Sequence, residues 1–453
     1  MYTFLLLPLF LHMGVFLQCF GVGFFALMIP AFLFYRAGYQ DDKHSTLLKL
    51  SIALIVIYLI FPVSNIVNYL FLKANFQEAM ISTGKEFFKT SKLFSSRISG
   101  GIFGTSLLLM IIAYFSRPKA SPTSASPENQ AEKILKLFSI GSLIACFALF
   151  LYASVQHFTG FDYRLPGQMM PPTNLMNDGR YRAMGLYGHP LSLAGSSLAL
   201  FCFFYSLAWK NLKEQFLSLQ YTAIYLSIAL GHICIIFLSG SRFAALIAFS
   251  YLIAIPIFVK VPAKVAKYRN GFIFLSVILI PLIGYFSGIF KRFKELNLSS
   301  DWTTIIGERS IFWKVHWQMF VDQPFWGQGY AFVTQYLRTY YYNTMGYEKL
   351  VRKYNAHNAY LETATCVGII GTIVILFAGY IFLKQLHQYS KDSPISKTVF
   401  KCFLIALSAN AINGLTQNTA YDATICYQYI GMFMVVIWIS RYHRQDSISQ
   451  KAL

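Results

Sequence analysis

The chain has 453 residues, of which 56% are hydrophobic and only 12% are charged. A soluble fold of this size needs a polar face on nearly every element, so the long uncharged stretches exclude an ordinary soluble protein and indicate helices that pack against lipid or one another. The net charge of +20 would suggest nucleic acid as a partner of a soluble protein, but membrane proteins carry Lys and Arg to fix topology, and we predict no nucleic-acid partner.

The predicted elements are membrane-spanning helices, since a helix needs about 20 apolar residues to cross a bilayer. The first apolar stretch, 3–35, is too long for one untilted helix and contains glycines and a proline that divide it, so one helix or two are compatible with the sequence. Further spans are predicted at 50–72, 100–116, 137–155, 189–209, 219–239, 243–259, 271–289, 357–383, 402–420 and 424–440. We therefore predict an all-α polytopic membrane protein of about 12 helices.

Basic residues indicate the orientation, because cytoplasmic connections are enriched in Lys and Arg. The connections 117–136, 260–269 and 384–401 and the C-terminal tail are basic, and alternation of the spans places all of them on one side, which we expect to be the cytoplasm. Residues 121–130 are expected to form a disordered tether. The basic and aromatic segment 73–99 falls on the opposite side, and we interpret it as an amphipathic surface helix.

This topology divides the chain into five parts: N-terminal membrane helices 1–155, an external loop 156–188, central membrane helices 189–289, a large external loop 290–356, and C-terminal helices with a cytoplasmic tail 357–453. Loops of such length between spanning helices are uncommon unless they have a function, so we expect the site on the external face. The seven cysteines lie in or beside apolar spans. They show neither a disulfide framework nor metal spacing, so we predict no metal and no cofactor.

Four polar motifs lie at this predicted external face. They are RYR at 180–182 followed by GHP at 188–190, LSGSR at 238–242, the block from Glu308 and Arg309 to PFWGQG at 324–329, and HNAYLE at 357–362. Arg242 is the most informative residue, because an arginine at a helix break near the membrane surface is costly unless it is paired or hydrated. Guanidinium groups bind phosphate oxygens bidentately, and topology anchors belong on the inner side. Arg182, Arg242 and Arg309 therefore fit a pyrophosphate better than anchors.

The candidate proton acceptor is His357, which opens a helix and carries a side chain able to take a proton from a sugar hydroxyl near neutral pH. A structural hydrogen bond is the commoner role for such a histidine. Competing residues are His12, His189, His232 and His316; we expect His232 to pack in the core and His189 to cap or hydrogen-bond at its helix start.

Acidic and aromatic residues complete the set of candidates. Glu308 and Glu362 are alternative acids, although Glu362 is also compatible with a hydrogen bond inside its helix bundle. The aromatic run from Tyr336 to Tyr347 fits stacking on sugar rings and an interfacial belt equally well. Trp313 and Trp317, four residues apart, are expected to pack one face of an interfacial helix.

The sequences LSGSR at 238–242, ERSIFWKVHWQMFVDQPFWGQGY at 308–330 and HNAYLETATCVGIIG at 357–371 resemble, in order and separation, those of the O-antigen ligase and polymerase superfamily. The resemblance covers residues 180–371, whereas the N-terminal third is similar only in hydropathy. It implies a fold of about 12 transmembrane helices with both termini cytoplasmic. It also implies a metal-independent glycosyltransferase in the bacterial inner membrane that acts at the periplasmic face on an undecaprenyl-pyrophosphate-linked glycan.

The resemblance also implies roles for individual residues. In the family, the arginine of the SR motif and the arginine that opens the tryptophan-containing block hold the donor pyrophosphate, which implies this role for Arg242 and Arg309. Arg182 is assigned to an upstream arginine, with Arg180 two residues away as the alternative. The histidine of the HN motif, His357, is implied as the catalytic residue. Residues in supporting roles would be Arg180, His189, Ser241, Glu308 and Asn358.

The acceptor remains open at this point. An O-antigen ligase would use a lipid A-core sugar hydroxyl, a polymerase another carrier-linked repeat unit, and a protein O-oligosaccharyltransferase a serine or threonine. A transporter of lipid-linked glycan would show charged residues in the middle of several spans and repeated halves. The sequence shows neither feature, which favours an enzyme surrounded by membrane lipids. Sugar specificity and oligomeric state are not indicated.

Overall fold

The computed structural model describes residues 127–259 apart from 177, 308–348 apart from 331, 332 and 334–336, and 355–417 apart from 392, with single positions within 56–67, 266–285 and 425–440. Within these residues the structure is helical, and extended pairing is limited to two isolated bridges, Phe161 with Met169 and Leu175 with Tyr181. This confirms the all-α prediction for the described part of the chain. The spans predicted at 3–35, 50–72, 100–116, 271–289 and 424–440 and the segment 73–99 lie outside the continuous described ranges.

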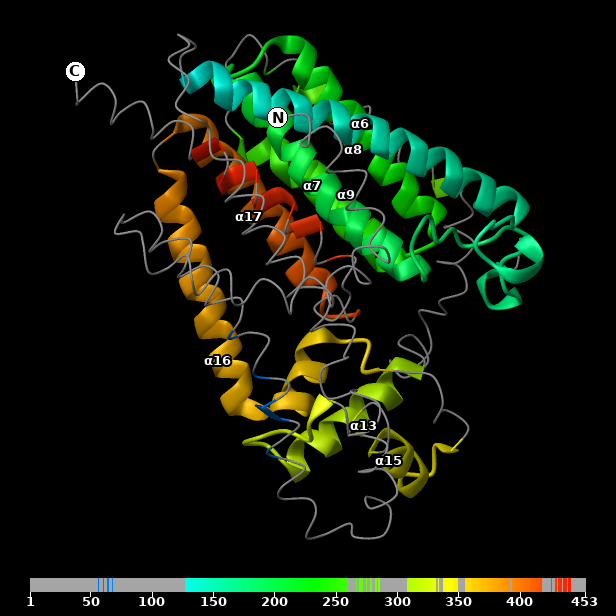
Figure 1. The fold of residues 1–453 in the computed structure, drawn as a ribbon. Coiled ribbons are helices and arrows are strands. Elements are labelled where there is room, and N and C mark those ends of the chain that lie inside the picture. Colours follow the sequence, from blue (N-terminus) through cyan, green and yellow to red (C-terminus); the bar gives the residue numbers. More distant parts are fainter. Residues whose placement is uncertain are drawn as a thin grey trace.

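Five helices form a bundle in the upper part of Figure 1. They are α6 (Pro127–Thr159), α7 (Pro190–Glu214), α8 (Leu219–Leu238), α9 (Arg242–Phe258) and α17 (Pro394–Asn413). α7 lies at the centre, and its side chains are buried almost without interruption from Leu193 to Trp209. A helix that is apolar on every side is stable only when it is surrounded, which explains this position. Small residues of α7 permit close approach: a Cβ added to Gly195 would overlap Ile425.

A second group of helices, which we call the head, lies below the bundle in Figure 1. It consists of α13 (Glu308–Asp322), α15 (Arg338–Thr344) and the first turns of α16 (Ala359–Ser390). Phe312, Val315 and Met319 of α13 pack with Tyr342 of α15 and Cys366 of α16 in a separate small core. The predicted external loop 290–356 therefore contains helices of its own.

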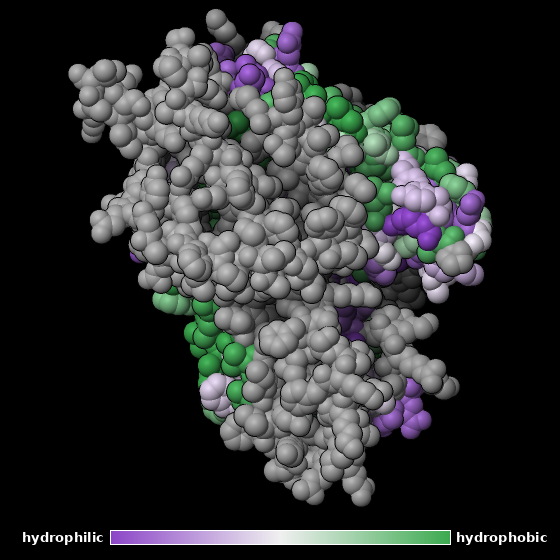
Figure 2. Space-filling view, viewed as in Figure 1, coloured by the Kyte–Doolittle hydropathy of each residue, from purple (hydrophilic) through white to green (hydrophobic). Residues whose placement is uncertain are grey.

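In the part of the chain that the structure describes, five helices are long and apolar enough to cross a membrane: Ala131–Thr159, Pro190–Glu214, Leu219–Leu238, Ala359–Ser390 and Pro394–Asn413. A shorter apolar helix, Arg242–Phe258, corresponds to the span predicted at 243–259. On α16 the exposed apolar residues Ile369, Ile373, Leu376, Phe377 and Tyr380 share one helix face, and the surface along this helix is green in Figure 2. Such a face is suited to lipid contact.

Three predicted boundaries are wrong. The span predicted at 402–420 is α17, Pro394–Asn413, because Ser393 caps a helix with Pro394 in its first turn. The predicted connection 384–401 is mostly helical, with only residues 391–393 between α16 and α17. The predicted tether at 121–130 ends early, since α6 begins at Pro127. A proline with its fixed φ is favourable in a first helical turn, so both prolines start helices here.

α16 is broken at Gly368, and the segment 324–329 occupies the break. Gly368 has φ 67° and ψ −171°, a conformation that residues with a Cβ essentially do not adopt. The carbonyl groups of Thr365 and Cys366 accept hydrogen bonds from the amides of Gln328 (2.7 Å) and Gly329 (2.9 Å), and the amide of Ile369 donates to Pro324 (2.8 Å). A Cβ on Gly327 or Gly368 would overlap the opposing backbone. The PFWGQG and VGIIG sequences therefore lock the head onto α16.

Candidate active site

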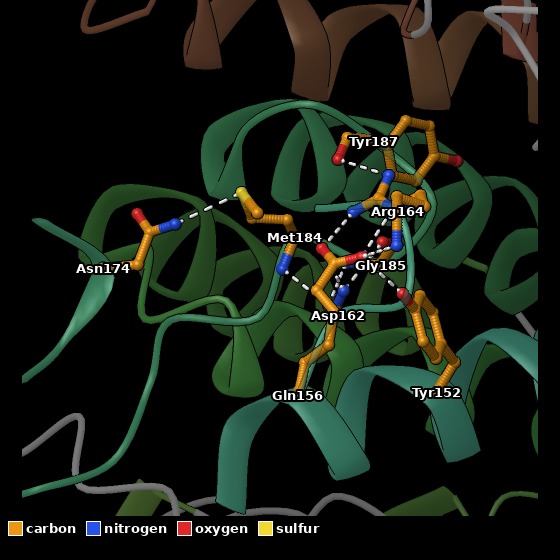
Figure 3. Close-up of polar contacts among 8 residues, drawn as sticks. All are labelled: Tyr152, Gln156, Asp162, Arg164, Asn174, Met184, Gly185 and Tyr187. Atoms are coloured by element: carbon orange, nitrogen blue, oxygen red, sulfur yellow. Dashed lines mark hydrogen bonds and ion pairs between the residues drawn. The ribbon is translucent and has the colours of Figure 1, made fainter. Parts of the chain in front are cut away.

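The connection between α6 and α7 is folded around a buried ion pair. Two short 3-10 turns, η1 (Pro166–Gln168) and η2 (Pro172–Asn174), lie in it. The side chain of Asp162 is fully buried and contacts Arg164 Nη2 at 2.7 Å, Tyr152 Oη at 2.7 Å and Gln156 Nε2 at 3.0 Å, as Figure 3 shows. Burial opposes ionisation of Asp162, but the hydrogen bonds from Arg164 and Tyr152 outweigh it and lower the pKa of the carboxyl group. Arg164 Nη1 also donates to the carbonyl group of Tyr187 at 2.9 Å, which fixes both ends of the loop.

This loop carries Arg182 to the LSGSR motif. Arg182 Nε donates to the carbonyl oxygen of Ser239 at 3.2 Å, and the amide of Ala183 donates to that of Leu238 at 3.0 Å. His157, at the end of α6, has Nδ1 within 3.2 Å of the same Leu238 oxygen. The last carbonyl groups of a helix lack intrahelical partners, so the end of α8 is satisfied by the loop.

The LSGSR motif is the turn between α8 and α9. Gly240 has φ 65°, which permits the reversal. Ser241 precedes α9 and is buried, and its hydroxyl accepts a hydrogen bond from Gln417 Nε2 at 3.2 Å. Arg242 is the first residue of α9 and is partly exposed. The predicted position of this arginine at a helix break is confirmed.

The HN motif is the entrance to α16. His357 has φ 46°, in the left-handed region, and Asn358 is the N-cap, whose side-chain oxygen accepts from the amides of Tyr360 and Leu361, both at 3.0 Å. The amide of Ala359 donates to the carbonyl oxygen of Gly414 at 2.8 Å. Because Gly414 and Gln417 belong to the same turn after α17, this turn joins the HN motif to Ser241.

Glu362, in the first turn of α16, ties this entrance to the head. It is 1% exposed. One carboxylate oxygen lies 3.3 Å from Arg338 Nη2, and the other lies 3.2 Å from His316 Nε2 and accepts from the amide of Ala356 at 2.7 Å. Of the two roles considered for Glu362, these contacts match the hydrogen-bonding one, with partners in the head.

His357 is partly buried beside positive charge. Its ring centroid lies 5.9 Å from that of Phe312. Burial, followed by the charges of Arg309 and His189, lowers the pKa of His357 to about 4, although Glu362 acts in the opposite direction. The imidazole is therefore neutral at neutral pH, the state in which it can accept a proton. Arg309 and His189 lie within electrostatic range of His357, which brings together residues from α13, from the start of α7 and from the HN motif.

The remaining candidates have local structural positions. Arg180 pairs with Asp178 at 3.4 Å, and His189 is the N-cap of α7, where Nδ1 accepts from the amide of Leu191 at 3.1 Å. His232 is buried in the core, as predicted. Glu308 begins α13, and its side chain lies outside the described residues, as does His12.

The aromatic candidates divide between packing and exposure. Trp317 is 58% exposed, so the packed face of α13 is formed by Phe312, Val315 and Met319, with Trp313 partly buried. In the run 336–347, Tyr342 is fully buried, Tyr340 is 48% exposed, and Tyr341 donates a hydrogen bond to Asp322. Tyr340, Tyr341 and Tyr342 therefore do not share one exposed surface, neither for stacking on sugar rings nor for an interfacial belt.

The sequence motifs missed Arg338 and treated His316 only as a competitor of His357. One signal was present: Glu362 is the only acidic residue between Ala359 and Ser390, and an acid in an apolar helix requires partners. Among the described residues, no group of three His, Cys, Asp or Glu side chains is arranged to hold a metal ion.

These contacts define a membrane protein in which His357, at the entrance of α16, lies in electrostatic range of Arg309 and Arg338. Residues 225–376 match the model of a family described as O-antigen ligase, so this segment carries an O-antigen ligase family domain, as the resemblance predicted. The match includes Arg242, Arg309 and His357 and stops short of Arg180, Arg182 and His189. A comparison with curated proteins finds no match.

Proposed function

We propose that the protein is an O-antigen ligase, which transfers a glycan from undecaprenyl pyrophosphate to a sugar hydroxyl of lipid A-core at the periplasmic face of the bacterial inner membrane. The observation that carries this proposal is the neutral, partly buried His357 in electrostatic range of Arg309, in a domain that matches the O-antigen ligase family. Polar contacts link the same entrance to the turn before Arg242 and, beyond it, to Arg182.

The chemistry follows from charge. The donor pyrophosphate is a good leaving group once its negative charge is neutralised, and the permanently charged guanidinium groups of Arg242, Arg309 and Arg182 would supply that neutralisation without a metal. His357 would take the proton of the acceptor hydroxyl. The bound anion would offset the positive charge of Arg309 and so raise the pKa of His357, which makes the base stronger when the donor is present. A single direct displacement would invert the anomeric carbon.

The test is transfer by the purified protein in lipid vesicles, with undecaprenyl-pyrophosphate-linked glycan as donor, lipid A-core as acceptor and a chelator present. Because general-base catalysis contributes about 10²–10⁴-fold, we expect His357→Ala to lower the rate by at least 10²-fold. We expect Arg242→Ala to abolish transfer and Arg242→Lys to transfer poorly, since one ammonium cannot replace a planar guanidinium.

His387→Ala is the matched control, because His387 is an exposed residue in the last turn of α16. Near-normal transfer by His357→Ala or Arg242→Ala would refute the proposal.

The acceptor is tested by deleting the gene and examining the lipopolysaccharide. A ligase predicts loss of all long chains while carrier-linked polymer accumulates. If the lipid A-core of the deletion strain carries a single repeat unit, the protein is a polymerase. If the lipopolysaccharide is normal and a protein substrate is unglycosylated, the protein is a protein O-oligosaccharyltransferase. Donor movement across vesicles without any transfer would identify a transporter.

A further inference from the structure

The carboxylate of Glu362 lies where three segments of the site meet. It is almost completely buried and contacts His316 of α13, Arg338 of α15 and the backbone immediately before His357. A buried carboxylate is costly unless its oxygens are paired and hydrogen-bonded, and here both oxygens have partners. Substrate has no access to a side chain with this exposure, so Glu362 acts through its neighbours.

The partners of Glu362 are themselves held in place. His316 Nδ1 lies 2.8 Å from the carbonyl oxygen of Phe312, one turn earlier in α13. The carbonyl oxygen of His316 accepts from Thr365 Oγ1 of α16 at 3.0 Å. Together with the contact between His316 Nε2 and Glu362, this hydrogen bond joins the same turn of α13 to the same turn of α16. Glu362 therefore has little freedom to move away from the HN motif.

The contact with Ala356 bears directly on His357. The amide of Ala356 donates to Glu362 at 2.7 Å, and the next residue, His357, adopts φ 46°. A non-glycine residue in this region is unfavourable and persists only when its surroundings enforce it. On the other side of His357, Asn358 caps α16 and Ala359 is bound to Gly414. The backbone is thus held on both sides of the histidine.

We propose that Glu362 is a positioning residue for His357, with Arg338 and His316 holding its carboxylate. The inference rests on the proposed function for the catalytic role of His357, but the geometric claim is independent of the reaction. Glu362 fixes the amide of Ala356, the residue before the strained His357, and so holds the imidazole in electrostatic range of Arg309.

The first experiment is kinetic. We expect Glu362→Gln to lower kcat by about 10–100-fold, because displacement of a reacting group by about 1 Å costs about 10²-fold, and to change KM for the donor by less than about threefold. Glu214→Gln is the matched control: Glu214 accepts a hydrogen bond from Thr398 and joins α7 to α17. An unchanged kcat in Glu362→Gln would overturn the proposal.

The pH dependence of kcat/KM separates positioning from a general loss of structure. The proton acceptor works when neutral, so the rate falls as pH falls through the pKa of His357. Burial and the charges of Arg309, His189 and Arg338 lower this pKa, and among the described residues Glu362 is the group that raises it. Glu362→Gln should therefore move the acid limb to lower pH, and Arg338→Gln should move it to higher pH. Shifts in the same direction, or no shift in either variant, would contradict the arrangement. Arg338→Gln preserves the Ala356 contact and provides this test even if Glu362→Gln fails to fold.

A second measurement needs no transferase activity. Diethyl pyrocarbonate acylates neutral imidazole, and mass spectrometry of the peptide that contains His357 gives its rate of modification. We expect this rate to change at least threefold in Glu362→Gln and to stay unchanged in Glu214→Gln. If the wild type shows no transfer to any acceptor, the proposed function fails, while this measurement still decides whether Glu362 positions His357. Equal rates in all three proteins would overturn the positioning role.

Discussion

The bundle of α6, α7, α8, α9 and α17 and the head of α13, α15 and the start of α16 are stabilised by different contacts. In the bundle, apolar side chains of α7 such as Phe203 and Phe204 are fully buried, and backbone hydrogen bonds from helices to other segments lie at helix ends, as at Leu238. In the head, the break at Gly368 leaves backbone groups of α16 that bond to residues 324–329, and an ion pair lies beside a small core.

The difference explains where the site lies. Lipid-exposed backbone must be satisfied within its own helix, whereas irregular backbone is tolerated where protein covers it. The head and the loop before α7 supply that cover at the ends of the spanning helices. Polar side chains are then oriented by specific partners rather than by packing alone, which suits the charged donor of the proposed function.

The largest loss of stability is expected from a substitution at Gly368, where the head is bound to α16. Gly368→Ala should destabilise the protein by about 3 kcal/mol or more, since a conformation that suits only glycine costs about 1–3 kcal/mol and the new Cβ also overlaps the carbonyl group of Phe325, which adds about 1–3 kcal/mol. Gly379→Ala in the same helix is the control, because a Cβ there meets nothing within 4 Å. Thermal unfolding in detergent compares them, and equal stability would show that the interlock contributes nothing.

A smaller effect is expected in the loop before α7. Asp162→Asn removes the charge of a fully buried carboxylate from its arginine, and because Arg164 is 24% exposed the cost should be about 2 kcal/mol, below the about 3–5 kcal/mol of a pair buried on both sides. Glu132→Gln, which removes the partly exposed i,i+4 partner of Lys136, should cost less than about 0.5 kcal/mol. The rates of amide hydrogen exchange of residues 160–187 are compared between the two variants.

Lowering the pH should have the same effect as Asp162→Asn. Because the folded pKa of Asp162 is lowered, its stabilisation is present above the usual aspartate pKa and is lost as pH falls through the lowered value. The Asn variant should lack this acid-dependent change, and faster exchange in Glu132→Gln than in Asp162→Asn would contradict the assignment.

The helices were largely predictable from the sequence, because apolar length alone identifies a segment that can cross a bilayer. The predicted spans at 189–209 and 219–239 correspond to α7 and α8. The boundaries predicted near 384–402 are wrong because basic residues such as Lys384, Lys397 and Lys401 indicate a connection by composition, whereas long basic side chains are also compatible with helix ends that project from the apolar region. The Gly368 break was not predicted, since the conformation of a glycine inside an apolar run depends on what packs against it.

For the site, the sequence indicated Arg242, Arg309 and His357 but not what orients them. Motifs report residue types at fixed spacing, and the contacts of Glu362 join residues from three separate segments. Arg338 lies within a run of tyrosines, where nothing local marks its partner in α16. Long-range pairing of this kind requires the fold.

The smallest effect is predicted at Asn358. Substitutions there test whether this residue only caps α16 or also contacts the substrate. Its side chain accepts hydrogen bonds from two amides of the first turn of α16, so Asn358→Ala should cost about 1 kcal/mol, and Asn358→Ser should retain both the cap and the transfer rate. Ser393→Ala, which removes the corresponding cap of α17, should lower thermal stability and leave transfer unchanged. If Asn358→Ser is as stable as the wild type but loses transfer, Asn358 contacts the substrate, and the entrance of α16 supplies a second reacting group beside His357.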